Sequence, residues 1–242
     1  MPTVVCFGAS LTAGTVSFDY VELLQSRPEL AGYRFINHGV NGDLAWNGLQ
    51  RLYQVIAEQP DYVSILIGTN DVNATLSERN RVRYVAFNHL PVAHPDLRWY
   101  EETLREIVGR LQRETQAKLA LMTLAPIGED PEHEAFRRVI EYNEVIVRVA
   151  RDAGVPCLPL HERMVKYLRE HEADQAALPP RLAYRDGLHN VGNAVALHAR
   201  GLSWDEVSAR NGLLLTTDGL HLNSRGGGMI AELIAEWLVT AR

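Results

Sequence analysis

Five short runs rich in β-branched and apolar residues alternate with longer segments of helical spacing along this chain. The runs lie at 2–7, 33–37, 61–67, 118–124 and 155–160. Strands that alternate with helices in this way form a parallel sheet, and the helices cover both of its faces. The alternation therefore predicts an α/β fold, a three-layer sandwich around a five-stranded parallel sheet.

The segments between these runs carry apolar residues at helical spacing. Such spacing is found at 49–56, 97–111 and 136–147, and Gly154 follows the third segment as a helix terminator. In the final segment, apolar residues repeat as adjacent pairs every four positions: Met229, Ile230, Leu233, Ile234, Trp237 and Leu238. We expect this last stripe to pack on the sheet.

Two stretches fit the alternation poorly. Asn, Arg, His and Pro are interspersed through 71–95, and 171–217 contains Pro179-Pro180 and several glycines. We predict a single domain over 1–242 with loop-rich insertions at about 72–97 and 171–217. Connections this long often form pocket walls or lids, and a partly helical surface insertion is the alternative for each.

Charge and hydropathy exclude two kinds of partner. The chain has 24 Lys and Arg residues against 30 Asp and Glu, so it offers no basic surplus for nucleic acid. No apolar run approaches the roughly 20 residues of a membrane-spanning helix. We also find no basic leader with a small-residue cleavage site, and we expect a cytoplasmic location with no membrane span. The oligomeric state is left open by the sequence.

Small polar residues and glycines follow the first three predicted strands. The segments are Gly8-Ala9-Ser10-Leu11-Thr12, Asn37-His38-Gly39-Val40-Asn41-Gly42-Asp43 and Gly68-Thr69-Asn70-Asp71. Any one of them alone reads as an ordinary strand-to-helix turn. In an open parallel sheet, however, ligands bind beyond the carboxyl ends of the strands, so the three segments together indicate a functional site.

Ser10 has the partners that a nucleophilic serine requires. Those partners are a base within hydrogen-bond reach, a carboxylate that orients the base, and donors for a developing oxyanion. In Asp218-Gly219-Leu220-His221 a carboxylate and an imidazole lie three residues apart, just before the final helix. Asp218 can orient Nδ1 of His221 and leave Nε2 for Ser10. An isolated pair of this spacing can also be a turn cap beside a packed histidine.

The oxyanion donors would come from three different strand ends. We expect the backbone N–H groups of Ser10 and Gly42 and the side-chain amide of Asn70 to supply them. Gly42 suits this role because a missing Cβ lets a backbone amide approach the substrate closely.

These segments, in this order, resemble the four sequence blocks of the SGNH hydrolase superfamily, also called GDSL esterases and lipases. The resemblance covers most of the chain and departs at Ala9, where the family has Asp. It implies a flavodoxin-like three-layer fold and hydrolysis of carboxylic esters. It also implies Ser10 as nucleophile, Gly42 and Asn70 as oxyanion partners, and Asp218 with His221 as the remaining members of the triad.

A second Asp-Gly-Leu-His lies at 186–189, so Asp186 and His189 have the same spacing as the first pair. The family places its pair directly before the C-terminal helix. Only 218–221 is followed by that helix, and we therefore assign His221 rather than His189.

Two other functions remain open. The hydroxyl groups of Ser10, Thr12 and Thr15 could form a phosphate loop for a flavin or nucleotide, although the complete P-loop pattern is absent. The second alternative function is that of a metal-dependent hydrolase, although the sequence contains no HExxH motif. Its candidate ligands are Asp186, His189, Asp218, His221, His38, His89 and His94.

We therefore predict an ester hydrolase that forms an acyl-serine and needs no cofactor and no metal. Its partner would be a small-molecule ester, with short-chain carboxylic esters the first choice. Lysophospholipids, thioesters and acetylated carbohydrates are the variants. Arg79, Arg81 and Arg83 could meet an anionic leaving group, or simply form a solvated charged surface.

Overall fold

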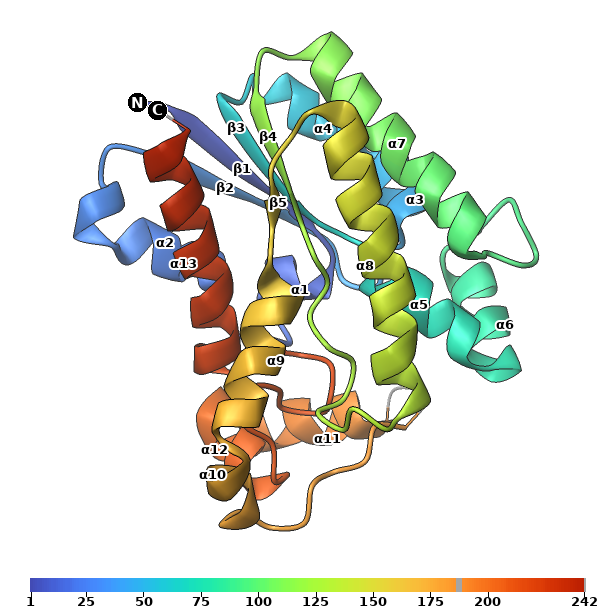
Figure 1. Ribbon diagram of the computed structural model, residues 1–242, viewed down its shortest axis with the longest axis vertical. Helices are drawn as coiled ribbons and strands as arrows, with labels where there is room; N and C mark the ends of the chain where they lie inside the picture. Colours follow the sequence, from blue (N-terminus) through green and yellow to red (C-terminus); the bar gives the residue numbers. More distant parts are fainter. Residues whose placement is uncertain (186–188, 242) are drawn as a thin grey trace.

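The computed structural model describes residues 1–185 and 189–241, except for the side chain of residue 189 (Figure 1). Its sheet has the strand order β2-β1-β3-β4-β5 with every pairing parallel. The strands are β1 (Thr3–Gly8), β2 (Arg34–Gly39), β3 (Tyr62–Leu66), β4 (Lys118–Met122) and β5 (Cys157–Leu158). The predicted α/β fold with five parallel strands is confirmed.

The edge strand β5 is shorter than the predicted run at 155–160. It pairs with β4 only through Cys157 and Leu158. Pro159 then occupies the N-cap of the next helix, and a proline has no N–H with which to extend the ladder.

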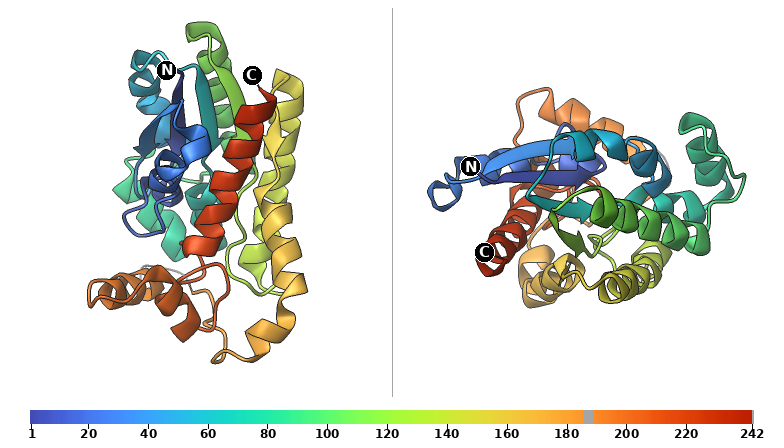
Figure 2. Two further views of the ribbon diagram at one scale, coloured as in Figure 1. Left: turned by 90° about the vertical axis from the view of Figure 1, so that its left-hand side faces the viewer. Right: turned by 90° about the horizontal axis from the view of Figure 1, so that it is seen from above.

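Contacts between helices divide them into two groups on opposite faces of the sheet (Figures 1 and 2). One group consists of α2 (Tyr20–Ser26), α9 (Leu160–Glu170) and α13 (Ser224–Thr240). The other consists of α3 (Ala45–Gln50), α4 (Leu52–Ala57), α7 (Leu97–Glu114) and α8 (Glu134–Ala153). A short helix α1 (Ser10–Ala13) and a 3-10 turn at Pro28–Leu30 complete the first third of the chain.

The final helix packs as its apolar stripe predicts. All six residues of the stripe are buried, and Trp237 meets Tyr62 of β3 edge to face with ring centroids 5.6 Å apart. The side chain of Asn223 caps the start of α13 by accepting a hydrogen bond from the N–H of Gly226 at 3.0 Å. The cap therefore fixes the start of the helix at Ser224, shortly after His221.

The two stretches described above as loop-rich are partly helical, which corrects that description. The first contains most of α5 (Thr69–Leu76) and all of α6 (Glu78–Phe87). The second contains α10 (Glu172–Ala176), α11 (His189–His198) and α12 (Trp204–Arg210). Local capping accounts for the start of α6 and of α12, since the hydroxyls of Ser77 and Ser203 each accept a hydrogen bond from a backbone N–H of the first turn at 3.2 Å.

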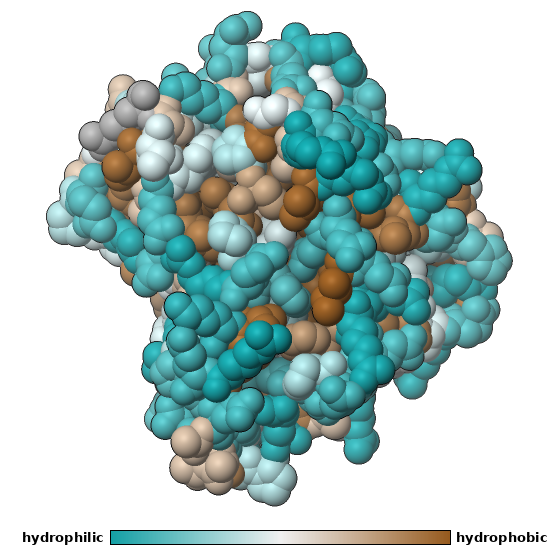
Figure 3. All heavy atoms as spheres, viewed as in Figure 1, coloured by the Kyte–Doolittle hydropathy of each residue, from teal (hydrophilic) through white to brown (hydrophobic). Residues whose placement is uncertain are grey.

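The surface around α13, α9 and α8 is mostly hydrophilic, with apolar side chains in small separate patches (Figure 3). Among the described helices, none combines the length and the apolarity needed to cross a bilayer. Cys6 and Cys157 are free thiols, and burial raises the pKa of Cys6 to about 12. The thiol of Cys6 therefore stays protonated at neutral pH.

Candidate active site

The strand register brings the three glycine-containing segments to one edge of the sheet. Gly8 at the end of β1 pairs with Gly39 of β2 and with Leu66 of β3. The chain leaves all three strands at the same level, and Ser10 and Asn70 both lie in the first turn of the helix that follows their strand. The excursion 171–217, orange in Figure 2, lies across this end of the molecule.

Ser10, His221 and Asp218 form a continuous hydrogen-bonded row. Nε2 of His221 lies 3.0 Å from Oγ of Ser10, and Nδ1 lies 2.8 Å from Oδ2 of Asp218. The three residues are 7%, 4% and 2% exposed, respectively. Water therefore competes little for these hydrogen bonds.

The second carboxylate oxygen of Asp218 holds its own turn. Oδ1 accepts hydrogen bonds from the N–H groups of Leu220 at 2.8 Å and His221 at 2.7 Å. Burial on its own raises the pKa of Asp218, but the neighbouring His221 and these hydrogen bonds outweigh it and leave the pKa below its usual value. The carboxylate is thus ionised at neutral pH and fixed against the imidazole.

The side chain of Asn70 is oriented from both sides. Its Nδ2 donates to the backbone oxygen of Asp43 at 2.8 Å, and its Oδ1 accepts from the hydroxyl of Tyr84 at 2.9 Å. A carboxamide nitrogen carries two hydrogens, so the contact with Asp43 leaves one for a ligand. Tyr84 was not singled out from the sequence, although it lies in the stretch expected to form a pocket wall.

Gly42 has a backbone conformation that suits glycine. Its φ is 83°, in the left-handed region. A Cβ at this position would meet only the ring of Phe87, at 3.4 Å. The backbone angle, in addition to the close approach anticipated from the sequence, therefore accounts for the glycine.

All five residues predicted for the site line one cavity of about 210 Å³. The walls come from both excursions, as expected: Asn73, Arg83 and Tyr84 from the first, and Tyr184, Arg185, Asn190 and Val191 from the second. Of the three arginines considered above, Arg83 reaches this cavity, whereas Arg81 pairs with Glu78. Val16, Asn41 and Leu220 complete the lining.

A buried carboxylate missed by sequence reasoning holds the segment before Asp218. Glu129 is 3% exposed, and its carboxylate accepts hydrogen bonds from the backbone N–H groups of Leu214, Leu215 and Thr216, each at 2.8 Å. Beside it, the N–H of Gly128 donates to the backbone oxygen of Gly219 at 2.6 Å. The loop after β4 thus supports the turn that contains Asp218 and His221.

Arg51 ties the ends of two strands to the segment around Gly42. Its guanidinium donates to Asp43 Oδ2 at 2.6 Å and to the backbone oxygens of His38 at 3.0 Å and Gly8 at 2.9 Å. Five fixed N–H donors make arginine suited to such a three-way contact. The signal in the sequence was weak, because an arginine between two helical segments reads as a surface residue.

The hydroxyls proposed for a phosphate loop are engaged within the protein. Thr12 is fully buried, and its Oγ1 accepts a hydrogen bond from the hydroxyl of Tyr20 at 3.0 Å. Oγ1 of Thr15 accepts from Nδ2 of Asn41 at 2.8 Å. This arrangement disfavours a phosphate-binding role for the first loop.

The histidines and carboxylates that the structure describes form no cluster for a metal ion. Within residues 1–185 and 189–241, no three His, Cys, Asp or Glu side chains are placed to hold a metal ion. His38 instead contacts Glu58 at 3.3 Å. Asp186 and the side chain of His189 lie outside the described residues, and the backbone of His189 begins α11.

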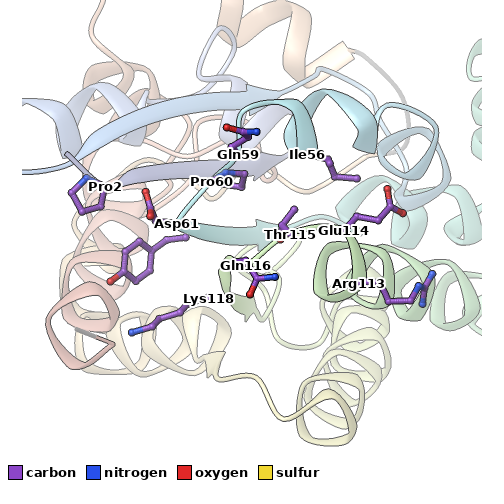
Figure 4. Close-up of a pocket in the computed structure, with 11 residues that line it drawn as sticks. Pro2, Ile56, Gln59, Pro60, Asp61, Arg113, Glu114, Thr115, Gln116 and Lys118 are labelled. Carbon is purple, nitrogen blue, oxygen red and sulfur yellow. The ribbon is translucent and has the colours of Figure 1, made fainter.

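A larger hollow of about 640 Å³ lies at the opposite edge of the sheet (Figure 4). Its lining includes Asp61 and Lys118, which are exposed, and Thr115, which is half-buried. Asp61 uses Oδ2 to accept a hydrogen bond from the N–H of Thr3 at 2.7 Å. Ser10, His221 and Asp218, the residues predicted as nucleophile, base and acid, line the smaller cavity and not this one.

Comparison with solved structures supports the fold. An acetyl xylan esterase, AlAXEase, superposes with a TM-score of 0.67 at 21% identity, covering 97% of this chain and 98% of that one. A catalytic mutant of Axe2, an acetylxylan esterase from Geobacillus stearothermophilus, gives a TM-score of 0.63 at 21% identity, covering 97% and 93%. LAE5, an α/β hydrolase from the metagenome of Lake Arreo, gives 0.64 at 22% identity, covering 97% and 94%.

Sequence comparison gives the family. A curated acetylxylan esterase from Geobacillus stearothermophilus is 36% identical over 151 residues, which are 61% of this chain and 63% of that protein. The chain thus spans just under two thirds of that relative's length. The model of the GDSL-like lipase/acylhydrolase family matches residues 6–227. The chain belongs to the GDSL-like lipase/acylhydrolase family.

Proposed function

We propose that this protein is a serine esterase that hydrolyses short-chain carboxylic esters through an acyl-Ser10 intermediate. The observation that carries the proposal is the buried row in which His221 lies 3.0 Å from Ser10 and 2.8 Å from Asp218. A hydroxyl, an imidazole and an ionised carboxylate in this order activate the hydroxyl as a nucleophile.

In the first half of the reaction, Nε2 of His221 takes the proton from Oγ of Ser10. The freed oxygen attacks the ester carbonyl carbon, and the carbonyl π electrons move onto its oxygen. The backbone N–H groups of Ser10 and Gly42 and the amide of Asn70 would stabilise that oxyanion. When the carbonyl reforms, the ester C–O bond breaks and the alcohol leaves with the proton from His221.

In the second half, water replaces the alcohol. His221 takes a proton from the water molecule, whose oxygen attacks the acyl carbon. The bond to Oγ of Ser10 then breaks, and the serine recovers its proton from His221. Asp218 stays ionised and stabilises the imidazolium in both halves.

The size and lining of the cavity favour a substrate with a small acyl group. Its volume is only about 210 Å³, and Asn41, Asn73 and Asn190 add polar groups to the wall. The 36% identical relative is an acetylxylan esterase. Catalytic mutants of Axe2 exist in which a serine, an aspartate or a histidine is replaced by alanine. These facts favour an acetyl ester, including an acetylated carbohydrate.

The organisation of the chain is part of the same proposal. We assign 1–242 to one domain in which the two partly helical excursions form the walls of the cavity. The family match over residues 6–227 supports this assignment.

The test is chemical labelling of Ser10. A fluorophosphonate should form an adduct that mass spectrometry locates on Ser10, and Ser10→Ala should reduce hydrolysis of p-nitrophenyl acetate by at least about a thousandfold. Ser26→Ala is the matched control, since Ser26 is exposed on α2 and its hydroxyl contacts only the backbone of Leu23 in the described chain. Wild-type turnover by Ser10→Ala would refute the proposal.

A further inference from the structure

The side chain of Tyr184 spans the cavity, from the Asp218–His221 turn on one side to helix α5 on the other. Its hydroxyl is hydrogen-bonded to Oδ1 of Asn73, three residues after Asn70 on α5. A Cβ atom placed on Gly219 would lie 3.4 Å from Cδ2 of Tyr184, so the ring faces the turn at a distance that one methyl group would fill. The side chain therefore connects two walls of the cavity above Ser10.

Two glycines, Gly128 and Gly219, lie next to the side chain of Tyr184. Gly128 and Gly219 have φ angles of 76° and 89°, and the N–H of Gly128 donates to the backbone oxygen of Gly219 at 2.6 Å. A Cβ placed on Gly128 would lie 3.4 Å from Cβ of Tyr184. Because neither glycine has a side chain, the tyrosine can lie near both backbones without a side chain between them.

A second hollow lies on the other side of Tyr184. Its volume is about 550 Å³, against about 210 Å³ for the cavity at Ser10. Among the described residues that line these two hollows, Tyr184 is common to both. His133 of the second hollow stands edge-on to the tyrosine, with ring centroids 5.8 Å apart and an interplanar angle of 84°. Tyr184 therefore contacts both hollows, with its hydroxyl on Asn73 of the first and its ring against His133 of the second.

We propose that Tyr184 determines substrate size by closing the cavity at Ser10 off from the adjoining 550 Å³ hollow. The inference rests on the proposed esterase function. With the ring present, the space beside the acyl-serine ends at Tyr184, which limits the enzyme to esters with small substituents. With the ring removed, the second hollow becomes an extension of the same cavity, and its lining of Asp130, His133 and Gln175 would receive the extra atoms.

The experiment measures kcat/KM for two ester series. One varies the acyl group, from p-nitrophenyl acetate to the octanoate, and the other varies the alcohol, from ethyl acetate to 1-naphthyl acetate. Tyr184→Ala should raise the large-to-small ratio of kcat/KM at least about tenfold in one of the two series, a typical gain for a few methylene groups in a pocket. Tyr184→Phe keeps the ring and should keep the wild-type ratio.

Tyr53→Ala is the matched control, because Tyr53 lies on α4 and is 61% exposed. Tyr184→Leu serves as a second variant, and circular dichroism checks that each variant is folded. Unchanged ratios in both series for both variants would overturn the inference. So would an equal loss on all substrates, because that result assigns Tyr184 a purely structural role.

The outcomes separate this inference from the function on which it rests. If Ser10→Ala is inactive and the ratios do not change, the esterase stands and the role of Tyr184 is wrong. If Ser10→Ala hydrolyses the esters as the wild type does, the proposed function fails whatever the ratios are.

Discussion

Oε1 of Glu129 accepts hydrogen bonds from both the backbone N–H and the hydroxyl of Thr216, at 2.8 and 2.9 Å. Thr216 lies two residues before Asp218, whereas Glu129 belongs to the loop after β4. A carboxylate from a distant part of the chain therefore fixes the backbone that leads into the Asp218–His221 turn. This contact gives the turn a rigid support outside its own sequence.

Replacing Glu129 should loosen that support. Glu129→Ala leaves two buried backbone N–H groups, of Leu215 and Thr216, and the partly buried N–H of Leu214 without their acceptor, which should cost about 3 kcal/mol or more in the free energy of unfolding. We also expect kcat to fall by about tenfold to a hundredfold with a smaller change in KM, because Asp218 and His221 lose their position. Thermal unfolding and steady-state kinetics measure the two effects. Glu132→Gln, at an exposed site in the same loop, is the control; wild-type stability of Glu129→Ala would contradict the prediction.

Asp218→Asn should separate orientation of the imidazole from folding. The asparagine oxygen can still accept from the N–H groups of Leu220 and His221, so the turn should remain intact. The side-chain amide cannot stabilise an imidazolium as a carboxylate does, and kcat should fall by about a thousandfold or more. Kinetics with p-nitrophenyl acetate and circular dichroism measure the two effects. A variant with more than a tenth of the wild-type kcat would show that this carboxylate is dispensable.

The amide of Asn70 should contribute to the transition state, and Tyr84 should act through it. Asn70→Ala removes the proposed oxyanion donor and should lower kcat by about a hundredfold to a thousandfold. Tyr84→Phe removes the hydrogen bond to Oδ1 of Asn70 but keeps the ring, so we expect a smaller loss of about tenfold. A double variant that is no slower than Asn70→Ala would link the two residues. Equal losses in both single variants that multiply in the double variant would contradict that link.

Asp71 should make stability depend on pH. Burial raises its pKa to about 8, and the neighbouring charge of Asp43 adds to this effect. The folded state then holds a proton that the unfolded state, with a pKa of about 3.9, has lost. The free energy of unfolding should therefore fall as pH rises from about 4 to about 8 and level off above that range.

Asp71→Asn tests this dependence, because the asparagine is neutral at every pH and its oxygen can accept the hydrogen bond that the N–H of Ala45 now donates at 3.0 Å. Urea denaturation at pH 5 and pH 8.5 should show a smaller difference for the variant than for the wild type. Equal differences for the two proteins would mean that Asp71 is ionised in the folded state.

The sequence predicted the residues whose chemistry depends on local spacing. Ser10 follows a segment with a clear β-strand pattern, and Asp218 and His221 lie three residues apart. The topology of a parallel sheet was therefore enough to predict that the three residues lie close together. The apolar stripe of α13 was equally local. Family resemblance then distinguished 218–221 from the second copy of the motif.

The supporting residues could not be predicted in the same way. Glu129 acts on backbone N–H groups 85 to 87 residues away, and such contacts leave no pattern in the sequence. Tyr184 packs on glycine backbones, which is also invisible in a side-chain pattern. The helices of the two excursions were expected only as the alternative to loops, because they are short, and two of them depend on a single capping serine, Ser77 or Ser203.

The hydrogen bond from Gly128 to Gly219 joins the loop after β4 to a turn that comes about ninety residues later in the chain. The position of that turn therefore depends on the loop. Anyone who redesigns this enzyme by exchanging loops should treat 126–130 and 214–221 as one unit. A swap of either segment alone would move the imidazole, whereas the two exchanged together would carry their alignment with them.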